Sequence, residues 1–240
     1  MPLPLLLALA GPLAPLPLQS GELHDAVVEG NIARVEIALT EGANVNEWLA
    51  EGTPLHLAAL AGNALIAETL IAGGANIEAA TSSGARPLHL AASANHTEVG
   101  IVLLEHGAQI NAPDREGRTP LIVAVEYGNF QTARLLLTRG ANPFAKDIHG
   151  TTALHFAAEA DIIATVELLL SWGVDINVLK SSNGQTPLFA AIDRRRSKMI
   201  RFLVAHGADV NIRDSAGRTP FQTATNAEIG RLLRQLGARD

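Results

Sequence analysis

The sequence predicts an all-α repeat solenoid, and three observations support this fold class. Alanine and leucine dominate, whereas aromatic residues are few, with one Tyr, two Trp and six Phe. This composition favours closely packed helices. A Thr-Pro-Leu-like segment recurs every 33 or 34 residues, and a Gly-Ala-like pair recurs in phase with it. Two markers that share a period of this length indicate stacked repeat units. The first marker begins at Thr53, Arg86, Thr119, Thr152, Thr186 and Thr219, and the second at Gly42, Gly74, Gly107, Gly140, Gly173, Gly207 and Gly237.

Each unit is expected to begin with a short helix. Thr53 is a good N-cap residue, and Pro54 suits the first helical position because it has no amide hydrogen to leave unpaired. Small and apolar residues such as Leu55 and Ala58 follow, and they allow a neighbouring helix to approach closely. Gly62 then tolerates the left-handed backbone that a sharp reversal requires. The first helix is therefore predicted to end near residue 61.

A second helix is expected after the reversal. Its apolar rows are visible from Glu98 to Leu104 and from Thr132 to Leu137. It ends at the Gly-Ala pair, and a segment rich in Asn and Gly, such as Asn111 to Gly117, leads to the next unit. Each unit is thus a helix-turn-helix followed by a turn.

These units resemble the ankyrin repeat. Asp114 to Leu121, DREGRTPL, is similar to the opening of that repeat, and Gly207 to Asn211, GADVN, is similar to its close. The resemblance covers residues 21–240. It implies antiparallel helix pairs with β-hairpin-like fingers, stacked into a curved solenoid. The seven units span about 22–51, 52–84, 85–117, 118–150, 151–184, 185–217 and 218–240.

Some units depart from the common pattern. The first lacks the capping opening, and the last carries Arg231 and Arg234 among leucines, as polar end units of a solenoid do. In the last unit we also expect the turn between the two helices to be about three residues shorter. Unit six has one extra residue in its finger, and unit two lacks one between Gly52 and Thr53.

Residues 1–20 form an apolar leader rich in Pro and Leu, without a charged side chain. One interpretation is a secretory signal peptide, with Leu5 to Ala10 as the apolar region and a cleavage site after Ala10. This interpretation predicts a secreted or periplasmic protein. The alternative is a leader without a targeting role in a cytoplasmic protein. The prolines make the segment unsuitable as a membrane-spanning helix.

The sequence offers no catalytic residue, cofactor site or metal site. Cysteine is absent, and none of the common nucleotide, hydrolase or metalloprotease motifs occurs. His56, His89 and His155 recur at equivalent places, where the resemblance implies that they bond to threonine and backbone rather than to a metal. The net charge of −6 argues against nucleic acid as a partner.

The strongest run of charge is Arg194-Arg195-Arg196-Ser197-Lys198. Arg195 falls where other units place Gly62 or Gly128 in the turn between helices, so a left-handed backbone is expected there. Two interpretations remain open for the run, a contact with an anionic partner and a solvated turn.

The resemblance implies a partner protein on the concave side, which is formed by the fingers and the first helices. Unusual residues on that side are the candidates for the binding site. Trp48 has a second interpretation, as a lid over the end unit. The candidates are Trp48, Leu49, Arg115, Arg118, Glu126, Tyr127, Ile148 and His149.

The predicted function is a non-enzymatic scaffold for protein–protein interaction, and we expect a monomer. The alternative is a regulatory or inhibitory subunit that caps an enzyme.

Overall fold

The structure is a computed structural model that describes residues 21–49 and 52–239. The leader at 1–20 lies outside the described residues. The described part contains fourteen helices in seven consecutive pairs, one pair for each predicted unit, and the all-α solenoid is confirmed. The helices are α1 (Glu22–Val28), α2 (Ile32–Thr40), α3 (Pro54–Ala61), α4 (Ala64–Ala72), α5 (Pro87–Ser93), α6 (Thr97–Glu105), α7 (Pro120–Glu126), α8 (Phe130–Thr138), α9 (Ala153–Ala160), α10 (Ile163–Ser171), α11 (Pro187–Asp193), α12 (Ser197–Ala205), α13 (Pro220–Thr223) and α14 (Ala227–Gln235).

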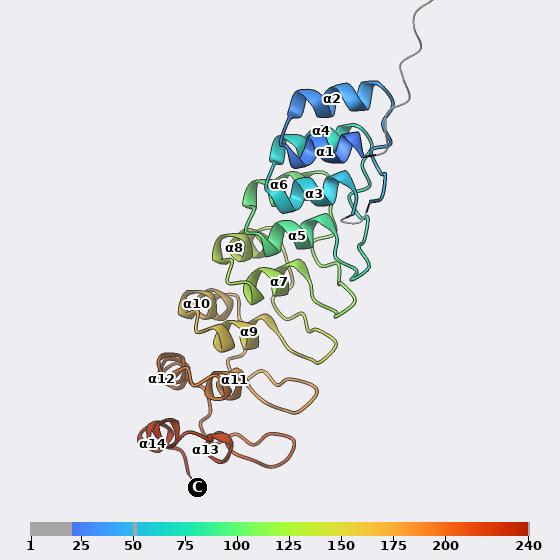
Figure 1. Ribbon diagram of the computed structural model, residues 1–240. Helices are drawn as coiled ribbons and strands as arrows, with labels where there is room; N and C mark the ends of the chain where they lie inside the picture. Colours follow the sequence, from blue (N-terminus) through green and yellow to red (C-terminus); the bar gives the residue numbers. More distant parts are fainter. Residues whose placement is uncertain (1–20, 50–51, 240) are drawn as a thin grey trace, which may run out of the picture.

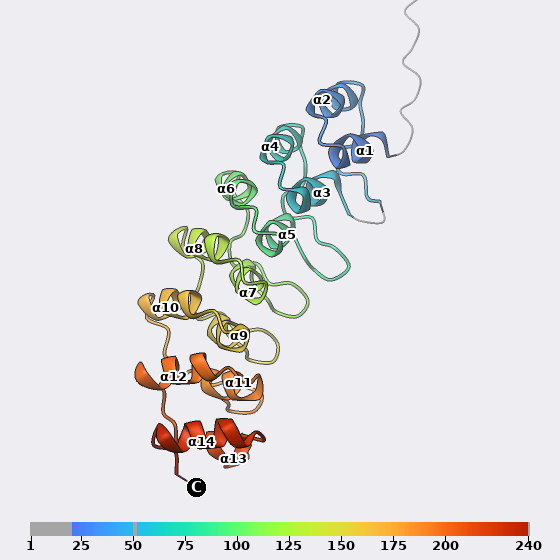
Figure 2. The same cartoon turned by 60° about the vertical axis from the view of Figure 1, so that its left-hand side comes forward.

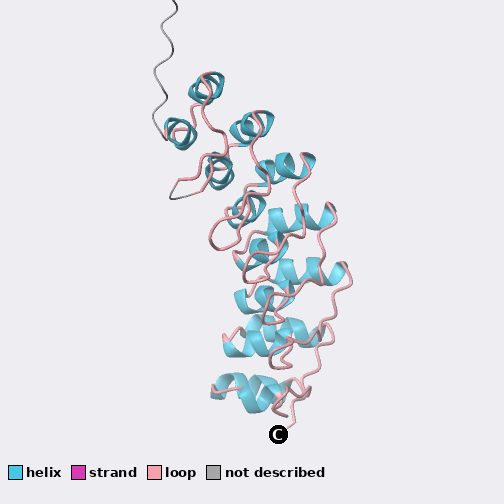
Figure 3. Ribbon diagram, turned by 90° about the vertical axis from the view of Figure 1, so that its right-hand side faces the viewer, coloured by secondary structure: helices cyan, strands magenta, loops and turns pink. Residues whose placement is uncertain are grey.

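The helices form two parallel rows (Figure 1). Each odd-numbered helix packs on the next odd-numbered helix and on its own even-numbered partner. The stack curves, and the odd-numbered row with the fingers lies on the inside of the curve (Figure 2). Loops connect all helices, and strands are absent from the described residues apart from two isolated bridges (Figure 3). The first helices and fingers therefore form one continuous side, called the inner surface below.

The recurring histidines hold the start of the first helix and, in units three and five, also reach the next unit. The backbone amide of Thr152 donates to Nδ1 of His155 at 3.3 Å, and the Thr152 hydroxyl lies 2.9 Å from the same nitrogen. Because Nδ1 accepts from an amide, the ring proton is on Nε2, which donates to the carbonyl of Gln185 at 3.1 Å. Nε2 of His89 lies 3.0 Å from the carbonyl of Arg118 in the same way. The predicted structural role of these histidines is confirmed.

The finger lengths also follow the sequence. In the unit with the ordinary spacing, the amide of Asp114 donates to the carbonyl of Arg118, four residues later. In the finger that leads into unit two, the corresponding bond spans three residues, from Leu49 to Gly52. In the finger that leads into unit six it spans five, from Lys180 to Gln185. The deletion and the insertion are thus absorbed within the hairpins, and the helices keep their register.

The core lies between the two rows. Leu103 of α6 and Leu136 of α8 are fully buried, as expected for residues between adjacent units. The loops after the second helices carry a second set of contacts between units. Asn46 accepts from the amide of Asn76 at 2.7 Å, and Asn177 accepts from the amide of Asp209 at 2.9 Å. We call this series the asparagine ladder. It is extended by Asn111, which accepts from Asn142, and by Asn211, which accepts from Arg239.

The expectation for the last unit was wrong. The segment from Ala224 to Asn226 between α13 and α14 has three residues, like Tyr127 to Asn129 between α7 and α8. The helix is shorter instead of the turn, since α13 has only four residues. The helix ends early because Ala224 is extended, and Asn226 caps α14 by accepting from the amides of Glu228 and Ile229.

Candidate partner-binding surface

The fingers are joined to one another by backbone hydrogen bonds. The amide of Arg115 donates to the carbonyl of Ser83 at 3.0 Å, and the amide of Ile148 donates to the carbonyl of Glu116 at 2.9 Å. The amide of Ser182 continues the series by donating to the carbonyl of His149 at 3.2 Å. The amide of Ser215 likewise donates to the carbonyl of Asn183 at 2.9 Å, so the fingers that lead into units three to seven form a connected ledge along the inner surface. The backbones of these fingers are held next to one another.

Trp48 packs against unit two on one side and is exposed on the other. Its ring meets the ring of His56 edge-on, with the centroids 5.4 Å apart. The side chain is nevertheless 49% exposed. Trp48 therefore covers the start of α3 and still presents half of its surface to solvent. Leu49 is half-buried and forms an isolated bridge with Gly52, so it contributes mainly to the short hairpin.

Arg115, Ile148 and His149 are exposed on two neighbouring fingers. The bond between Ile148 and Glu116 brings these fingers together. Ile148 is a large aliphatic side chain on a turn and is 61% exposed. These three residues form one patch at the middle of the ledge.

Arg118 and Glu126 are bound to each other. The guanidinium of Arg118 donates to Asp114 at 2.8 Å and to Glu126 at 3.1 Å. Asp114 is buried and also accepts from the amides of Glu116 and Arg118. Arg118 thus holds its own finger against α7, and its charge is balanced within the chain.

Tyr127 lies away from the candidates on the fingers. It is the C-cap residue of α7 and is 62% exposed. Since α7 has seven residues and rises about 1.5 Å per residue, Tyr127 is about 10 Å from the finger end of the helix. Trp48 precedes α3, two units earlier and at the finger end. The structure therefore does not bring the two aromatic residues together.

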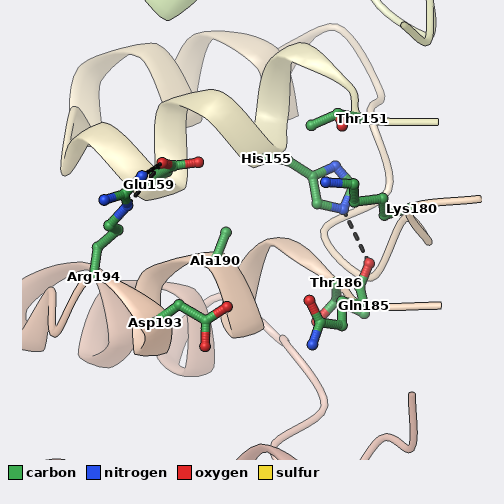
Figure 4. Close-up of a pocket in the computed structure, with 9 residues that line it drawn as sticks. All are labelled: Thr151, His155, Glu159, Lys180, Gln185, Thr186, Ala190, Asp193 and Arg194. Carbon is green, nitrogen blue, oxygen red and sulfur yellow. Dashed lines mark hydrogen bonds and ion pairs between the residues drawn. The ribbon is translucent and has the colours of Figure 1, made fainter. Parts of the chain in front are cut away.

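The inner surface contains a gap of about 330 Å³ between α9 and α11 (Figure 4). Its centre is bordered by Ala190, a small residue where the other inner helices carry larger ones such as Leu57 and Phe156. The missing volume leaves the space open. The gap is lined by Thr151, His155, Glu159, Lys180, Gln185, Thr186, Ala190, Asp193 and Arg194.

Charges of opposite sign stand at the two ends of the gap (Figure 4). Lys180 is at the finger end, and its ammonium has no hydrogen bond or ion pair to another described residue. Glu159 and Asp193 are at the other end. Arg194 binds Oε1 of Glu159, with Nε at 2.8 Å. Burial, and then the charge of Glu159, raise the pKa of Asp193 in spite of Arg218 and Arg194 nearby.

The wall at the finger end includes the buried ring of His155. Burial is the main cause that lowers its pKa to about 4, and the charges of Lys180 and Lys146 act in the same direction. His155 is therefore neutral at physiological pH. It keeps the hydrogen bond to the carbonyl of Gln185 that joins units five and six.

The arginine run is mostly structural. Arg194 pairs with Glu159 of the preceding unit, and Nε of Arg196 donates to the carbonyl of Glu159 at 3.0 Å. Arg195 has the expected left-handed backbone, with φ of 57°. Asn95 and Asp161 occupy the same place with φ of 60° and 65°. Two of the three arginines are thus engaged with the neighbouring unit.

The gap and Lys180 were not predicted from the sequence. One signal was present, because Lys180 stands where other fingers carry Asp114, Asp147 or Asp214. Another was Ala190, which is smaller than its counterparts in the preceding units.

Within residues 21–49 and 52–239, no group of His, Asp and Glu side chains has the arrangement of a metal site. In the same residues, no helix is long and apolar enough to cross a membrane.

These features define a helical repeat protein with a long open inner surface. Comparison with known families matches "Ankyrin repeats (3 copies)" over residues 23–114, 110–180 and 173–239. The chain belongs to the ankyrin-repeat family. Ankyrin repeats generally mediate protein–protein interactions, so protein partners are implied.

Comparisons with individual proteins also identify ankyrin repeats. The chain is 40% identical over 57 residues to ankyrin repeat-containing protein P1E11.10 of Schizosaccharomyces pombe (strain 972 / ATCC 24843), an alignment that covers 23% of this chain and 28% of that protein. The ankyrin repeat domain of Bcl-3, a unique member of the IkappaB protein family, superposes with a TM-score of 0.76 at 31% identity, over 89% of this chain and 97% of that one. The human ASB11 ankyrin repeat domain superposes with a TM-score of 0.80 at 26% identity, over 91% of this chain and 98% of that one.

Proposed function

We propose that the chain is a non-enzymatic scaffold that binds a partner protein on its inner surface. The observation that carries this proposal is the exposure of Trp48 and Ile148 on the fingers, at 49% and 61%. Large apolar side chains on turns are unfavourably hydrated unless another surface covers them. A monomer is proposed, and the net charge of −6 favours a protein over a nucleic acid as the partner.

The fixed position of the ledge supports binding by a preformed surface. The backbone bonds between fingers hold Arg115 beside the Ile148–His149 turn, so little conformational entropy is lost when a partner docks. Arg118 stabilises its finger, and we assign it no direct contact with the partner.

The two tryptophans provide a matched test. A partner is first isolated by pull-down from the native host, and its affinity is then measured for each variant by isothermal titration calorimetry. Trp48→Ala should weaken binding by about 2 kcal/mol, or about 30-fold, as a hot-spot aromatic residue does. Trp172→Ala removes a tryptophan that is 41% exposed at the end of α10 in the outer row, and it should leave binding unchanged. The opposite pattern would place the partner on the outer row.

A further inference from the structure

The gap between α9 and α11 has features that the scaffold role alone does not require. Ala190 opens it, whereas Leu57 and Leu90 show that a larger side chain is compatible with this position of the repeat. The gap borders the inner surface and lies between Lys180 and the carboxylates of Glu159 and Asp193 (Figure 4). It is therefore a polarised slot along the first helix of unit six.

The carboxylates of Glu159 and Asp193 at one end of the gap are only partly paired with cationic side chains. Arg194 contacts Oε1 of Glu159, and Oε2 has no hydrogen bond to another described residue. The carboxylate of Asp193 has no hydrogen bond or ion pair to any described side chain. An incoming cation would meet two carboxylate groups at this end, next to the guanidinium groups of Arg194 and Arg218.

A second, independent feature points to an occupant. Thr186 borders the gap and is fully buried, and its hydroxyl has no hydrogen-bond partner among the described residues. The equivalent Thr152 bonds His155, but unit six carries Phe189 in place of the histidine. Buried polar atoms without a partner are rare in folded proteins. A polar group of an occupant would supply the missing bond.

We propose that this gap receives an arginine side chain of the partner protein. The inference rests on the scaffold function proposed above and deepens it by naming the chemistry of recognition. The guanidinium lies against Asp193 and the free oxygen of Glu159, where its planar fork can donate to two carboxylates. The aliphatic part of the side chain lies on Ala190. Lys180 donates to a backbone carbonyl of the partner at the finger end.

The test uses the capped tripeptide Ac-Ala-Arg-Ala-NH2 as the probe. It is titrated into the ¹⁵N-labelled full chain, and amide chemical shifts are followed by NMR. We expect saturable shifts at Ala190, Asp193 and neighbouring residues, with a Kd on the order of 1 mM, which corresponds to about −4 kcal/mol. The same peptide with citrulline in place of arginine has nearly the same shape without the charge, and it should bind at least about fivefold more weakly.

Three variants locate the binding. Asp193→Asn should weaken arginine binding at least about fivefold, whereas Asp175→Asn, a matched change at an exposed loop, should leave it unchanged. Ala190→Leu fills the gap without a change in charge, and it should abolish the shifts while the circular dichroism spectrum and the urea midpoint stay close to those of the parent chain. Leucine at the equivalent positions 57 and 90 is the reason to expect an intact fold.

The proposal is overturned by the absence of saturable shifts up to about 20 mM peptide, by equal binding of the arginine and citrulline peptides, or by unchanged binding to Ala190→Leu. Failure of the scaffold function looks different. If the affinity of a partner falls with Trp48→Ala but is unchanged with Ala190→Leu, the scaffold function stands and the arginine pocket is contradicted.

Discussion

Lowering the pH should destabilise the fold through His155, and the size of the effect can be calculated. The folded pKa of about 4 lies about 2.5 units below the ordinary histidine value of 6.5. At about 1.4 kcal/mol per unit, the difference corresponds to about 3 kcal/mol. The sign follows from proton uptake. Between pH 6.5 and pH 4 the unfolded chain binds a proton that the folded chain does not, so the free energy of unfolding falls as the pH falls.

Burial is the largest influence on the pKa of His155, and it outweighs the groups that raise the pKa. The hydrogen bond to the carbonyl of Gln185 and the charge of Asp147 raise it, whereas the charges of Lys180 and Lys146 lower it. Protonation would also place a charge in a buried site, since His155 is 3% exposed. The hydrogen bond from Nε2 to the carbonyl of Gln185 is compatible with the neutral ring that accepts at Nδ1.

A matched variant isolates this contribution from other acid-sensitive groups. In unit seven Gln222 occupies the histidine position and accepts from the amide of Thr219 at 3.0 Å, so His155→Gln should keep the helix cap. Urea unfolding is measured for both chains from pH 7 to pH 4. The variant should be less stable at pH 7 by about 1 kcal/mol, for the lost bond to Gln185. The parent chain should lose about 3 kcal/mol more than the variant over the range. Parallel stability curves would refute the reasoning.

Four further predictions concern single positions. Leu136→Ala should cost about 2–5 kcal/mol in urea unfolding because Leu136 is fully buried, and a cost below about 0.5 kcal/mol would contradict its place in the core. Gly150→Ala should cost at least about 1 kcal/mol more than Gly140→Ala. Both glycines have positive φ. An added Cβ at Gly150 would clash with the backbone of Ser181, whereas at Gly140 it would meet nothing within 4 Å. Equal costs would show that the fingers can separate. Phe144→Asn should add a ladder bond and stabilise the chain by about 0.5–1.5 kcal/mol, and a loss of thermal stability would contradict this. If residues 1–20 are a cleaved signal, N-terminal sequencing of protein from the native host should begin after Ala10 or near Ser20, whereas Met1 or Pro2 would favour the cytoplasm.

The fold could be predicted from the sequence because its determinants are local and repeated. Thr53 with Pro54 starts a helix, and Gly62 allows the reversal, whatever the neighbouring units contain. The left-handed turn at Arg195 followed from the same alignment, because the position and not the residue type determines the backbone there. The early end of α13 was not predictable in this way, since a shorter helix and a shorter turn remove the same number of residues.

The candidate site was harder to predict because side-chain pairing depends on groups far apart in the chain. The pair Asp114–Arg118 is local and recurs as Asp214–Arg218, but the bond from Arg118 to Glu126 forms only when the finger folds against α7. Arg194 and Glu159 are 35 residues apart, and their ion pair depends on the stacking of units five and six. Ala190 is different, since the small residue is evident when equivalent positions of the repeat are compared in the sequence.

Two departures from the repeat, Lys180 and Ala190, both border the gap, and they argue that units five and six have a role beyond the solenoid frame. Beside them, Phe189 replaces the histidine that would bond Thr186. Lys180 replaces the aspartate that caps other fingers, and Ala190 removes apolar volume. Lys180 and Ala190 each give up a bond or a contact that other units keep. Their common location at the gap, beside the buried Thr186 hydroxyl that has no partner among the described residues, is expected if this part of the chain is adapted to a ligand.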